Sequence, residues 1–227
     1  MLLALDTSLD ATSAAVSLPD GDVVAARIEV GAARQAEWLM PMIEGVLHDA
    51  AIAPRALSRI GVSVGPGSFT GLRIALAAAR AMGTALGIPV IGVTTTQLVH
   101  ASAPTGAPVL VALDARHGRF YAEGFDASGA SRTGPYMAED GGDLAAGLCA
   151  GFAGAWPVPL IVGSGARSAH DLLIALGLEA RLHEVELLPD ARAMLPWLAR
   201  QQGRVGEMPA PLYLRGVDAR TLAERGL

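Results

Sequence analysis

The sequence contains no lysine, so all 17 of its basic residues are arginines. This absence excludes a P-loop lysine, a Schiff-base lysine and a serine–lysine dyad. The chain is also short of positive charge as a whole, with a formal net charge of −5 over 227 residues. Nucleic-acid affinity depends mainly on clustered Lys and Arg, and this balance therefore argues against a broad phosphate-binding surface.

Metal-binding and disulfide-forming residues are equally scarce. The single cysteine, Cys149, cannot form an internal disulfide or a Cys-rich zinc site, and we interpret it as a small buried hydrophobe on a helix. The five histidines show no His-x-x-x-His or His-Glu-x-x-His spacing: His48, His100, His117, His170 and His183. The sequence therefore predicts no zinc or iron site.

Long hydrophobic runs are missing although 52% of the residues are hydrophobic. The longest apolar stretch, Ile74–Leu86, is interrupted by Arg80 and is too short to span a bilayer. The opening Met1–Asp6 has no basic region, and we interpret it as a strand and not as a signal peptide. These patterns predict a cytoplasmic protein without membrane contact. Only 4% of the residues are aromatic, which favours a core of small aliphatic side chains where helices lie close on a sheet.

The expected elements occur in the same order twice. Strand-like runs are expected at 2–6, 13–18 and 23–30, then a helix at 34–50, a strand at 60–64, a helix at 70–86, a strand at 88–93 and a helix at 95–102. The second copy gives strands at 109–114, 119–125 and 130–136, a helix at 139–149, a strand at 160–162, a helix at 167–176, a strand at 181–184 and a helix at 190–202. A duplicated βββαβαβα order is the organisation of the two-lobed actin-like ATPase (ribonuclease H-like) fold. A single mixed α/β sheet is the alternative.

We place the two lobes at residues 1–105 and 106–227, because the Pro- and Gly-rich stretch 103–108 separates the two copies. The first lobe is the expected partner-binding lobe. The last helix of the second copy is able to pack back on the first lobe.

Two turns and one loop are candidate anion sites. Asp6-Thr7-Ser8 and Asp114 each follow the first strand of a copy, where a carboxylate and hydroxyls are able to hold Mg²⁺ and phosphate oxygens. Capping of the turn by its own side chains is the more common role of such residues. The loop Gly65–Gly71 follows a strand and opens a helix, but it lacks the ending of a P-loop, and close helix–sheet packing explains its glycines equally well.

The helix at 70–86 is apolar almost all round, apart from Arg73, Arg80 and Thr84. A helix that buries one face would be more polar, so its second face needs a cover. That cover is either the helix at 34–50 or a partner protein. Because Trp38 and Met40 lie off the main apolar stripe of the helix at 34–50, we favour a helix bundle shared with another subunit.

These motifs together resemble the TsaB (YeaZ) family across nearly the whole chain. Gly-Pro-Gly-Ser-Phe-Thr-Gly-Leu-Arg at 65–73 is the most specific of them. Leu3–Ser8, Leu113–Arg116 with Phe120-Tyr121, and the tail Pro211–Arg215 support it.

The resemblance implies a non-catalytic subunit of the machinery that makes threonylcarbamoyladenosine in tRNA. Such a subunit pairs through first-lobe helices with the catalytic subunit TsaD. A TsaE-like ATPase is a further partner, and TsaE and a carbamoyl-adenylate synthase complete the bacterial pathway. Alone, the subunit can form a homodimer through the same helices. On this basis tRNA contact is indirect, the isolated chain holds no tight cofactor, and ATP with Mg²⁺ belongs to the assembled complex. The turn residues Asp6, Thr7, Ser8 and Asp114 would be a vestigial phosphate loop. We expect the partner to contact Trp38, Leu39, Met42, Leu72, Arg73, Leu76, Ala79, Arg80 and Met82.

One departure from the family pattern concerns Ala36, which stands where relatives often carry His. A different function also remains open, namely a self-sufficient ATP-dependent small-molecule kinase or ATPase of the same superfamily. Asp6 and Asp114 would then face a shared cleft. Glycoprotease activity has no nucleophile or metal constellation to support it.

Overall fold

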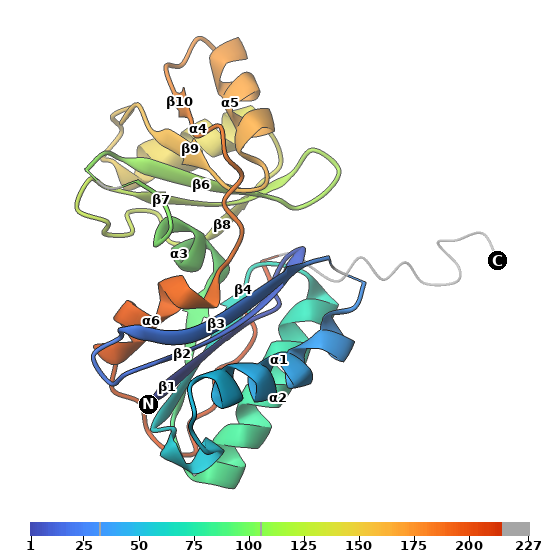
Figure 1. Ribbon diagram of the computed structural model, residues 1–227. Coiled ribbons are helices and arrows are strands. Elements are labelled where there is room, and N and C mark those ends of the chain that lie inside the picture. The colour runs from blue at the N-terminus through green and yellow to red at the C-terminus, as the bar shows by residue number, and fades with distance from the viewer. Residues whose placement is uncertain (32, 105, 215–227) are drawn as a thin grey trace, which may run out of the picture.

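The structure, a computed structural model, describes residues 1–31, 33–104 and 106–214. Its two lobes are stacked one above the other, and each is built on a five-stranded sheet (Figure 1). Arg215 of the predicted tail motif lies outside the described residues.

The sheet of the first lobe has the order β3-β2-β1-β4-β5. β1, β2 and β3 are antiparallel, whereas β4 and β5 run parallel to β1. The strands are β1 (Leu2–Asp6), β2 (Ala11–Ser17), β3 (Val23–Val30), β4 (Arg59–Gly65) and β5 (Val90–Thr94). β1 and β2 are fully buried because helices cover both faces of the sheet there.

The sheet of the second lobe repeats this topology with the order β8-β7-β6-β9-β10. Its strands are β6 (Val109–Asp114), β7 (Phe120–Phe125), β8 (Tyr136–Ala138), β9 (Leu160–Val162) and β10 (Arg181–Leu182). In both sheets the first strand of the copy is central and the third is at one edge. The predicted duplicated, two-lobed actin-like fold is confirmed, and the single-sheet alternative is wrong.

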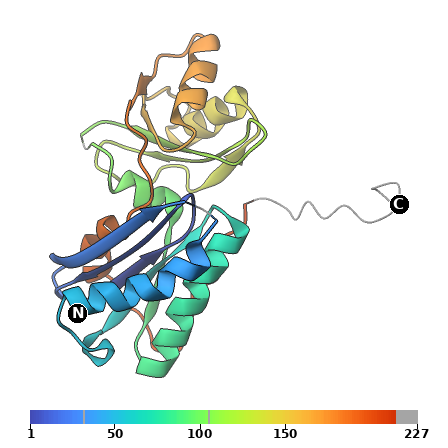
Figure 2. The ribbon, with the colours of Figure 1, turned by 45° about the vertical axis from the view of Figure 1, so that its right-hand side comes forward.

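Helices cover the sheets as the apolar patterns require. Figure 2 shows α1 (Gln35–Asp49) and α2 (Phe69–Leu86) side by side on one face of the first sheet, with α6 (Ala191–Ala199) on the other face. The remaining helices are η1 (Pro54–Ala56), α3 (Thr95–His100), α4 (Gly141–Gly151) and α5 (Ala166–Ala175). Within the described residues no helix has the length and apolar character needed to cross a membrane.

Local chemistry sets the two ends of α2. The side chain of Ser68 accepts a hydrogen bond from the Gly71 backbone N–H at 3.2 Å, which satisfies one free donor of the first turn. Gly87 ends the helix in the left-handed conformation with φ of 65°, which glycine adopts without steric cost. The predicted start and end of this helix are therefore correct to within one residue.

One predicted strand, at residues 130–136, is wrong. Ser131 makes only an isolated bridge to Phe125, and the strand β8 begins at Tyr136. The hydroxyls of Ser131 and Thr133 accept hydrogen bonds from the backbone N–H groups of Gly134 and Gly124. Side chains that bind the backbone in this way compete with a regular strand ladder.

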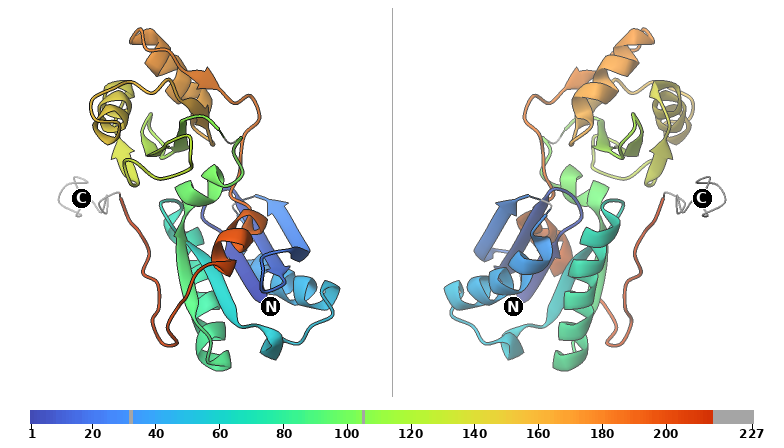
Figure 3. Two further views of the ribbon diagram at one scale, coloured as in Figure 1. Left: turned by 90° about the vertical axis from the view of Figure 1, so that its left-hand side faces the viewer. Right: turned by 90° about the vertical axis from the view of Figure 1, so that its right-hand side faces the viewer.

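The chain returns to the first lobe after β10. Helix α6 packs on β1 and β2, and the guanidinium of Arg59 donates to the carbonyls of Leu198 and Ala199 at its end, both at 3.1 Å. The segment 200–214, here called the C-terminal segment, then runs down and back along the first lobe (Figure 3). Its Leu212 N–H donates to Val64 O at 2.7 Å.

Candidate functional site

A cleft of about 840 Å³ opens between the two lobes. Residues from both lobes and from the C-terminal segment line it: Leu9, Asp10, Pro66, Gly67, Ser68, Phe69, Arg73, Asp114, Ala115, Arg116, Tyr121, Ser164, Glu186, Leu212, Tyr213 and Leu214. Of the four predicted phosphate-loop residues, only Asp114 is in this set.

The turn Asp6-Thr7-Ser8 is instead fully buried beneath the Gly65–Gly71 loop. Thr7 Oγ1 donates to Gly71 O at 2.6 Å, and Ser8 Oγ donates to Asp6 Oδ1 at 2.6 Å. A Cβ at Gly71 would lie 2.0 Å from Thr7 O, so the loop can approach this closely only with glycine. The packing role of the loop is therefore the one that the structure supports.

The carboxyl group of Asp6 is fully buried, which disfavours its charged form. Burial raises the pKa of Asp6 above its ordinary value, although hydrogen bonds from Ser8 and the proximity of Ser63 act in the opposite direction. Asp6 Oδ2 and Ser63 Oγ are both buried without a hydrogen-bond partner. A buried carboxylate with one unpaired oxygen favours its neutral form.

Gln35, the first residue of α1, binds the backbone that directly follows this turn. Its Nε2 donates to Leu9 O at 2.6 Å and to Ala11 O at 2.9 Å, and the side chain is buried. Sequence reasoning missed this residue, because a glutamine at a helix start carries no pattern that marks a tertiary contact. Gln35 directly precedes Ala36, the position at which this chain differs from the family pattern.

The second predicted turn lies open in the cleft. Asp114 is exposed, its Oδ1 accepts a hydrogen bond from Arg116 N at 2.8 Å, and its own N–H donates to Ser164 Oγ at 3.0 Å. This is the capping role that we considered more common for such a residue.

The residues present do not fit a Mg²⁺–nucleotide of the kind that an actin-like fold can hold. Asp6, Thr7 and Ser8 are sealed away from the cleft, and their hydroxyls are committed to partners within the chain. Asp6 and Asp114 therefore do not face a shared ligand, as a self-sufficient kinase would require.

One rim of the cleft is a stack formed by α2 and the C-terminal segment. The guanidinium carbon of Arg73 lies 3.6 Å from the centre of the Phe69 ring, a cation–π contact. The Phe69 and Tyr213 ring centres are 5.3 Å apart, and Arg73 Nε donates to Tyr213 Oη at 3.3 Å. Arg80 also donates to Pro209 O. The predicted residues Arg73 and Arg80 thus hold this chain's own C-terminal segment.

Five of the nine predicted partner-contact residues are buried in the first lobe's own core: Leu39, Met42, Leu72, Leu76 and Ala79. Their side chains are not available to a partner in this structure. The reason is physical: helical periodicity marks the stripe that packs on the sheet, and that stripe is used within the chain. Met82 is half-buried at the edge of this core.

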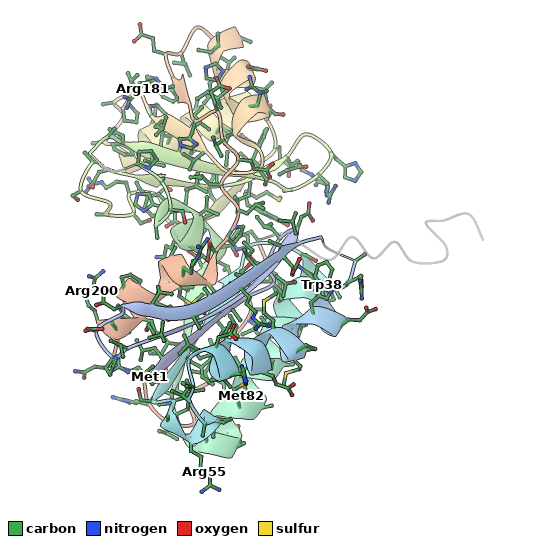
Figure 4. The ribbon with its side chains drawn as sticks, viewed as in Figure 1. Met1, Trp38, Arg55, Met82, Arg181 and Arg200 are labelled. Carbon is green, nitrogen blue, oxygen red and sulfur yellow. The ribbon has the colours of Figure 1, made fainter. Side chains whose placement is uncertain are left out.

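Trp38 is half-buried as well. A Cβ at Gly31 would lie 3.1 Å from its ring, and the Arg34 guanidinium carbon lies 5.4 Å from the ring centre. Figure 4 shows Trp38 on α1 and Met82 on α2, on the side of the first sheet that both helices cover. Trp38 is therefore less available to a partner than its position off the stripe indicated.

An exposed surface nevertheless remains on these two helices. Met40 of α1 is 47% exposed, and Ala77, Ala81 and Ala85 of α2 are exposed at intervals of four residues. We call these four residues the helix face. Small side chains let a second helix approach closely, and so the helix face is suited to helix–helix packing.

No group of three or more His, Cys, Asp or Glu side chains able to hold a metal occurs in residues 1–31, 33–104 and 106–214.

Known proteins resemble this chain over about half of its length or over nearly all of it. A family model described as TsaD, tRNA N6-adenosine threonylcarbamoyltransferase, matches residues 28–136. An uncharacterized protein of Mycobacterium tuberculosis is 40% identical over 121 residues, which cover 53% of this chain. That match spans 56% of the mycobacterial protein, only about half of its length.

The tRNA threonylcarbamoyladenosine biosynthesis protein TsaB of Escherichia coli K12 is 31% identical over 224 residues, and the match covers 94% of each chain. The chain belongs to the TsaB family. A crystal structure of a Pseudomonas aeruginosa protein with similarity to peptidase YeaZ matches 94% of this chain and 99% of its own, with a TM-score of 0.75 and 27% identity. The TsaB-family resemblance drawn from residues 65–73 and the supporting motifs is confirmed.

Proposed function

We propose that this TsaB-family chain is a non-catalytic partner subunit in the biosynthesis of threonylcarbamoyladenosine in tRNA, and that it pairs with a TsaD-like catalytic subunit. The observation that carries the proposal is the similarity to the Escherichia coli TsaB protein along 94% of both chains.

The closed turn supports the non-catalytic part of the proposal. Asp6, Thr7 and Ser8 would have to reach a ligand to act on it, yet they are fully buried beneath the Gly65–Gly71 loop. Opening the turn would break the Thr7–Gly71 and Gln35–Leu9 hydrogen bonds. Such buried bonds are expensive to leave unmade.

The helix face supports the pairing. The TsaD family model matches residues 28–136, which include both α1 and α2. Two related first lobes can therefore present equivalent helices to each other, in the way that identical subunits pair about an axis. Met40, Ala77, Ala81 and Ala85 supply an apolar, close-packing surface for this contact, while Leu39, Leu72 and Ala79 hold the helices on their own sheet.

The charge balance supports an indirect role in tRNA binding. A net charge of −5 disfavours a phosphate-binding surface, so in this proposal the partner subunits grip the tRNA. The same proposal includes pairing with a TsaE-like subunit. It also includes a homodimer that forms through the helix face when the partner is missing.

Mixing the purified chain with a TsaD-like subunit from the same source tests the pairing. We expect a heterodimer in size-exclusion chromatography with light scattering. Ala81→Arg should abolish it, because an unpaired charge at an interface core is costly. Ala146→Arg, an equally exposed alanine-to-arginine change on α4 of the other lobe, is the matched control and should leave the heterodimer intact. Separate peaks for the unaltered proteins would overturn the proposal.

Calorimetry with Mg-ATP separates this function from the kinase alternative. We propose that the isolated chain binds nucleotide weakly or not at all, and that ATP and Mg²⁺ enter only with the assembled complex. Tight binding of Mg-ATP by the isolated chain would support a self-sufficient enzyme, and we have no observation that favours that function.

A further inference from the structure

A second cavity, with a volume of about 290 Å³, lies where α3 and α6 meet between the lobes (Figure 1). The end of β5, the end of β7 and the turn after β7 complete its wall. The lining residues are Val93, Gln97, Leu98, His100, Ala101, Phe125, Gly129, Ser131, Ala193, Met194, Trp197 and Arg200. None of them lines the interlobe cleft or belongs to the helix face. A ligand bound here would therefore leave both of those surfaces free.

The wall of this cavity is mostly apolar. Val93, Leu98, Phe125 and Met194 are buried core residues, and the half-buried Trp197 adds the largest side chain. Ligand sites in proteins commonly enclose about 300–1,000 Å³, so this cavity is at the small end of the range. Its size and its wall suit a small molecule with a compact aromatic or branched aliphatic body.

The uncommitted polar groups of the lining are hydrogen-bond donors. Gln97 Oε1 accepts a hydrogen bond from Thr94 N at 3.2 Å, which leaves the Gln97 Nε2 group as the free end of the amide. Neither Gln97 Nε2, the Trp197 indole N–H nor the Arg200 guanidinium has a hydrogen-bond acceptor among residues 1–31, 33–104 and 106–214. Indole N–H groups that are out of water commonly have a partner. A ligand with acceptor atoms would satisfy these donors.

The charge of the lining is positive. No carboxylate is part of it, and Arg200 is its one guanidinium. Asp126 is the acidic residue that acts on the lining residue His100, and its charge is compensated. Asp126 Oδ1 accepts a hydrogen bond from Ser128 Oγ at 2.6 Å, and its Oδ2 lies 3.9 Å from Arg132 Nη1. The acceptor atoms of a ligand are therefore favoured when they carry negative charge.

The end of α6 would oppose an anion if its carbonyls were free, because the C-terminal end of a helix carries partial negative charge. The guanidinium of Arg59 donates to the carbonyls of Leu198 and Ala199, both at 3.1 Å, and also to Gln201 O. This contact places a positive charge on the helix end. The field of α6 is thus largely neutralised beside the cavity.

We propose that this cavity binds a small monocarboxylate with a compact aromatic or branched aliphatic body. The carboxylate pairs with the Arg200 guanidinium, whose paired donors match the two oxygens of a carboxylate. It also accepts hydrogen bonds from Gln97 Nε2 and the Trp197 indole. The apolar body packs on Leu98 and Met194.

Such a ligand would touch both lobes at once. Met194 and Trp197 belong to α6, which packs on the first sheet, whereas Phe125 and Gly129 belong to the second lobe. A ligand that binds only the folded chain stabilises it in proportion to the logarithm of its concentration above the dissociation constant. We expect the melting temperature to rise with ligand concentration.

NMR titration of the full chain with benzoate, phenylacetate and 3-methylbutanoate tests the proposal. The chain has three tryptophans, and Trp197→Phe assigns the indole N–H signal that belongs to the cavity. We expect at least one of these carboxylates to shift the Trp197 signal saturably, with a dissociation constant on the order of 1 mM or below, as suits so small a ligand. The signals of Trp38 and Trp156, which do not line the cavity, should not move.

Phenethylamine is the matched control ligand, because it has an ammonium group where phenylacetate has a carboxylate. It should leave the Trp197 signal unchanged, since Arg200 repels a cation.

Arg200→Ala tests the charge pair. The residue is exposed, so the variant should fold normally, and losing a charge-assisted hydrogen bond should weaken binding by roughly tenfold or more. Arg204→Ala is the matched control, because Arg204 is an exposed arginine outside the lining, and it should keep the affinity of the wild type. Ala101→Phe places a ring at the cavity from an exposed position and should block binding, while the melting temperature without ligand reports that the variant is folded.

Three results would overturn the proposal. The first is a Trp197 signal that none of the three carboxylates shifts at concentrations well above the millimolar range. The second is equal binding of phenethylamine and phenylacetate, which would show that the cavity does not select charge. The third is an affinity that Arg200→Ala leaves unchanged. Each of these results leaves the pairing with a TsaD-like subunit untouched, because the helix face lies elsewhere.

Discussion

Thr96 in α3 donates a hydrogen bond to the carboxylate of Glu123 in β7, and this contact joins the two lobes. The second carboxylate oxygen of Glu123 accepts a hydrogen bond from Ser131 Oγ at 2.5 Å, and the Glu123 side chain is almost fully buried. Beside this contact, the His100 ring of α3 stacks on Phe125 with ring centres 4.0 Å apart. Helix α3 is therefore fixed to the second lobe by polar and aromatic contacts at once.

Removing the Glu123 carboxylate should destabilise the protein. Glu123→Ala removes the acceptor of the buried Thr96 hydroxyl and of the exposed Ser131 hydroxyl. An unsatisfied buried group such as the Thr96 hydroxyl costs about 1–3 kcal/mol. We expect a lower free energy of unfolding in urea denaturation. Glu179→Ala, a change at an exposed glutamate of the second lobe, is the control and should have little effect. An unchanged midpoint for Glu123→Ala would show that water replaces the carboxylate.

The buried Asp6 should make the stability of the protein depend on pH. Burial raises the pKa of Asp6 above 3.8, the value expected in the unfolded chain. The unfolded state thus loses the proton first as the pH rises. The contribution of Asp6 to the free energy of unfolding is fully present below pH 3.8 and is lost as the pH rises through the folded-state pKa.

Asp6→Asn removes this titration and keeps an oxygen for the Ser8 hydrogen bond. Relative to the wild type, the variant should gain stability as the pH increases above 3.8, until Asp6 of the folded wild type is ionised. Urea unfolding at a series of pH values measures the difference. Asp10→Asn, at an exposed position, is the control. Parallel pH profiles for Asp6→Asn and the wild type would contradict the expected burial effect.

Tyr213 should hold the C-terminal segment on the first lobe. Tyr213→Ala removes the ring that lies 5.3 Å from Phe69 and the acceptor of the Arg73 hydrogen bond. We expect trypsin to cleave several-fold faster after Arg204, an exposed residue of the segment, because local opening governs such cleavage. Mass spectrometry of the fragments over time gives the rate. Tyr213→Phe keeps the ring and should stay close to the wild type; equal rates for Tyr213→Ala and the wild type would mean that other contacts hold the segment.

Most elements of the fold could be predicted because their causes are local. The apolar run Val109–Asp114 and the loop that opens α2 at Phe69 each carry their pattern within a few neighbouring residues. The strand expected at residues 130–136 failed for a reason of the same kind. Hydroxyl side chains at Ser131 and Thr133 bind the backbone there and displace the ladder.

The candidate site was predicted less well because periodicity does not show what covers a surface. Leu72 and Ala79 were expected to meet a partner, yet the sheet beneath α2 buries them. Part of the remaining surface of α2 is covered by the C-terminal segment, which is distant in the sequence. Arg73 and Arg80 bind this segment through Tyr213 and Pro209. The sequence did not indicate that Gln35 binds the backbone after the turn, because its partners, Leu9 and Ala11, precede it by more than twenty residues.

The sequence by itself determined the order of the elements, the duplication and the family, because these follow from patterns and motifs that are local in the chain. The tertiary structure alone decided that Asp6-Thr7-Ser8 is closed, that Asp114 is open and that α3 and α6 line one cavity. Burial and exposure depend on which distant segments come to lie against a residue. No local pattern of side chains carries that information.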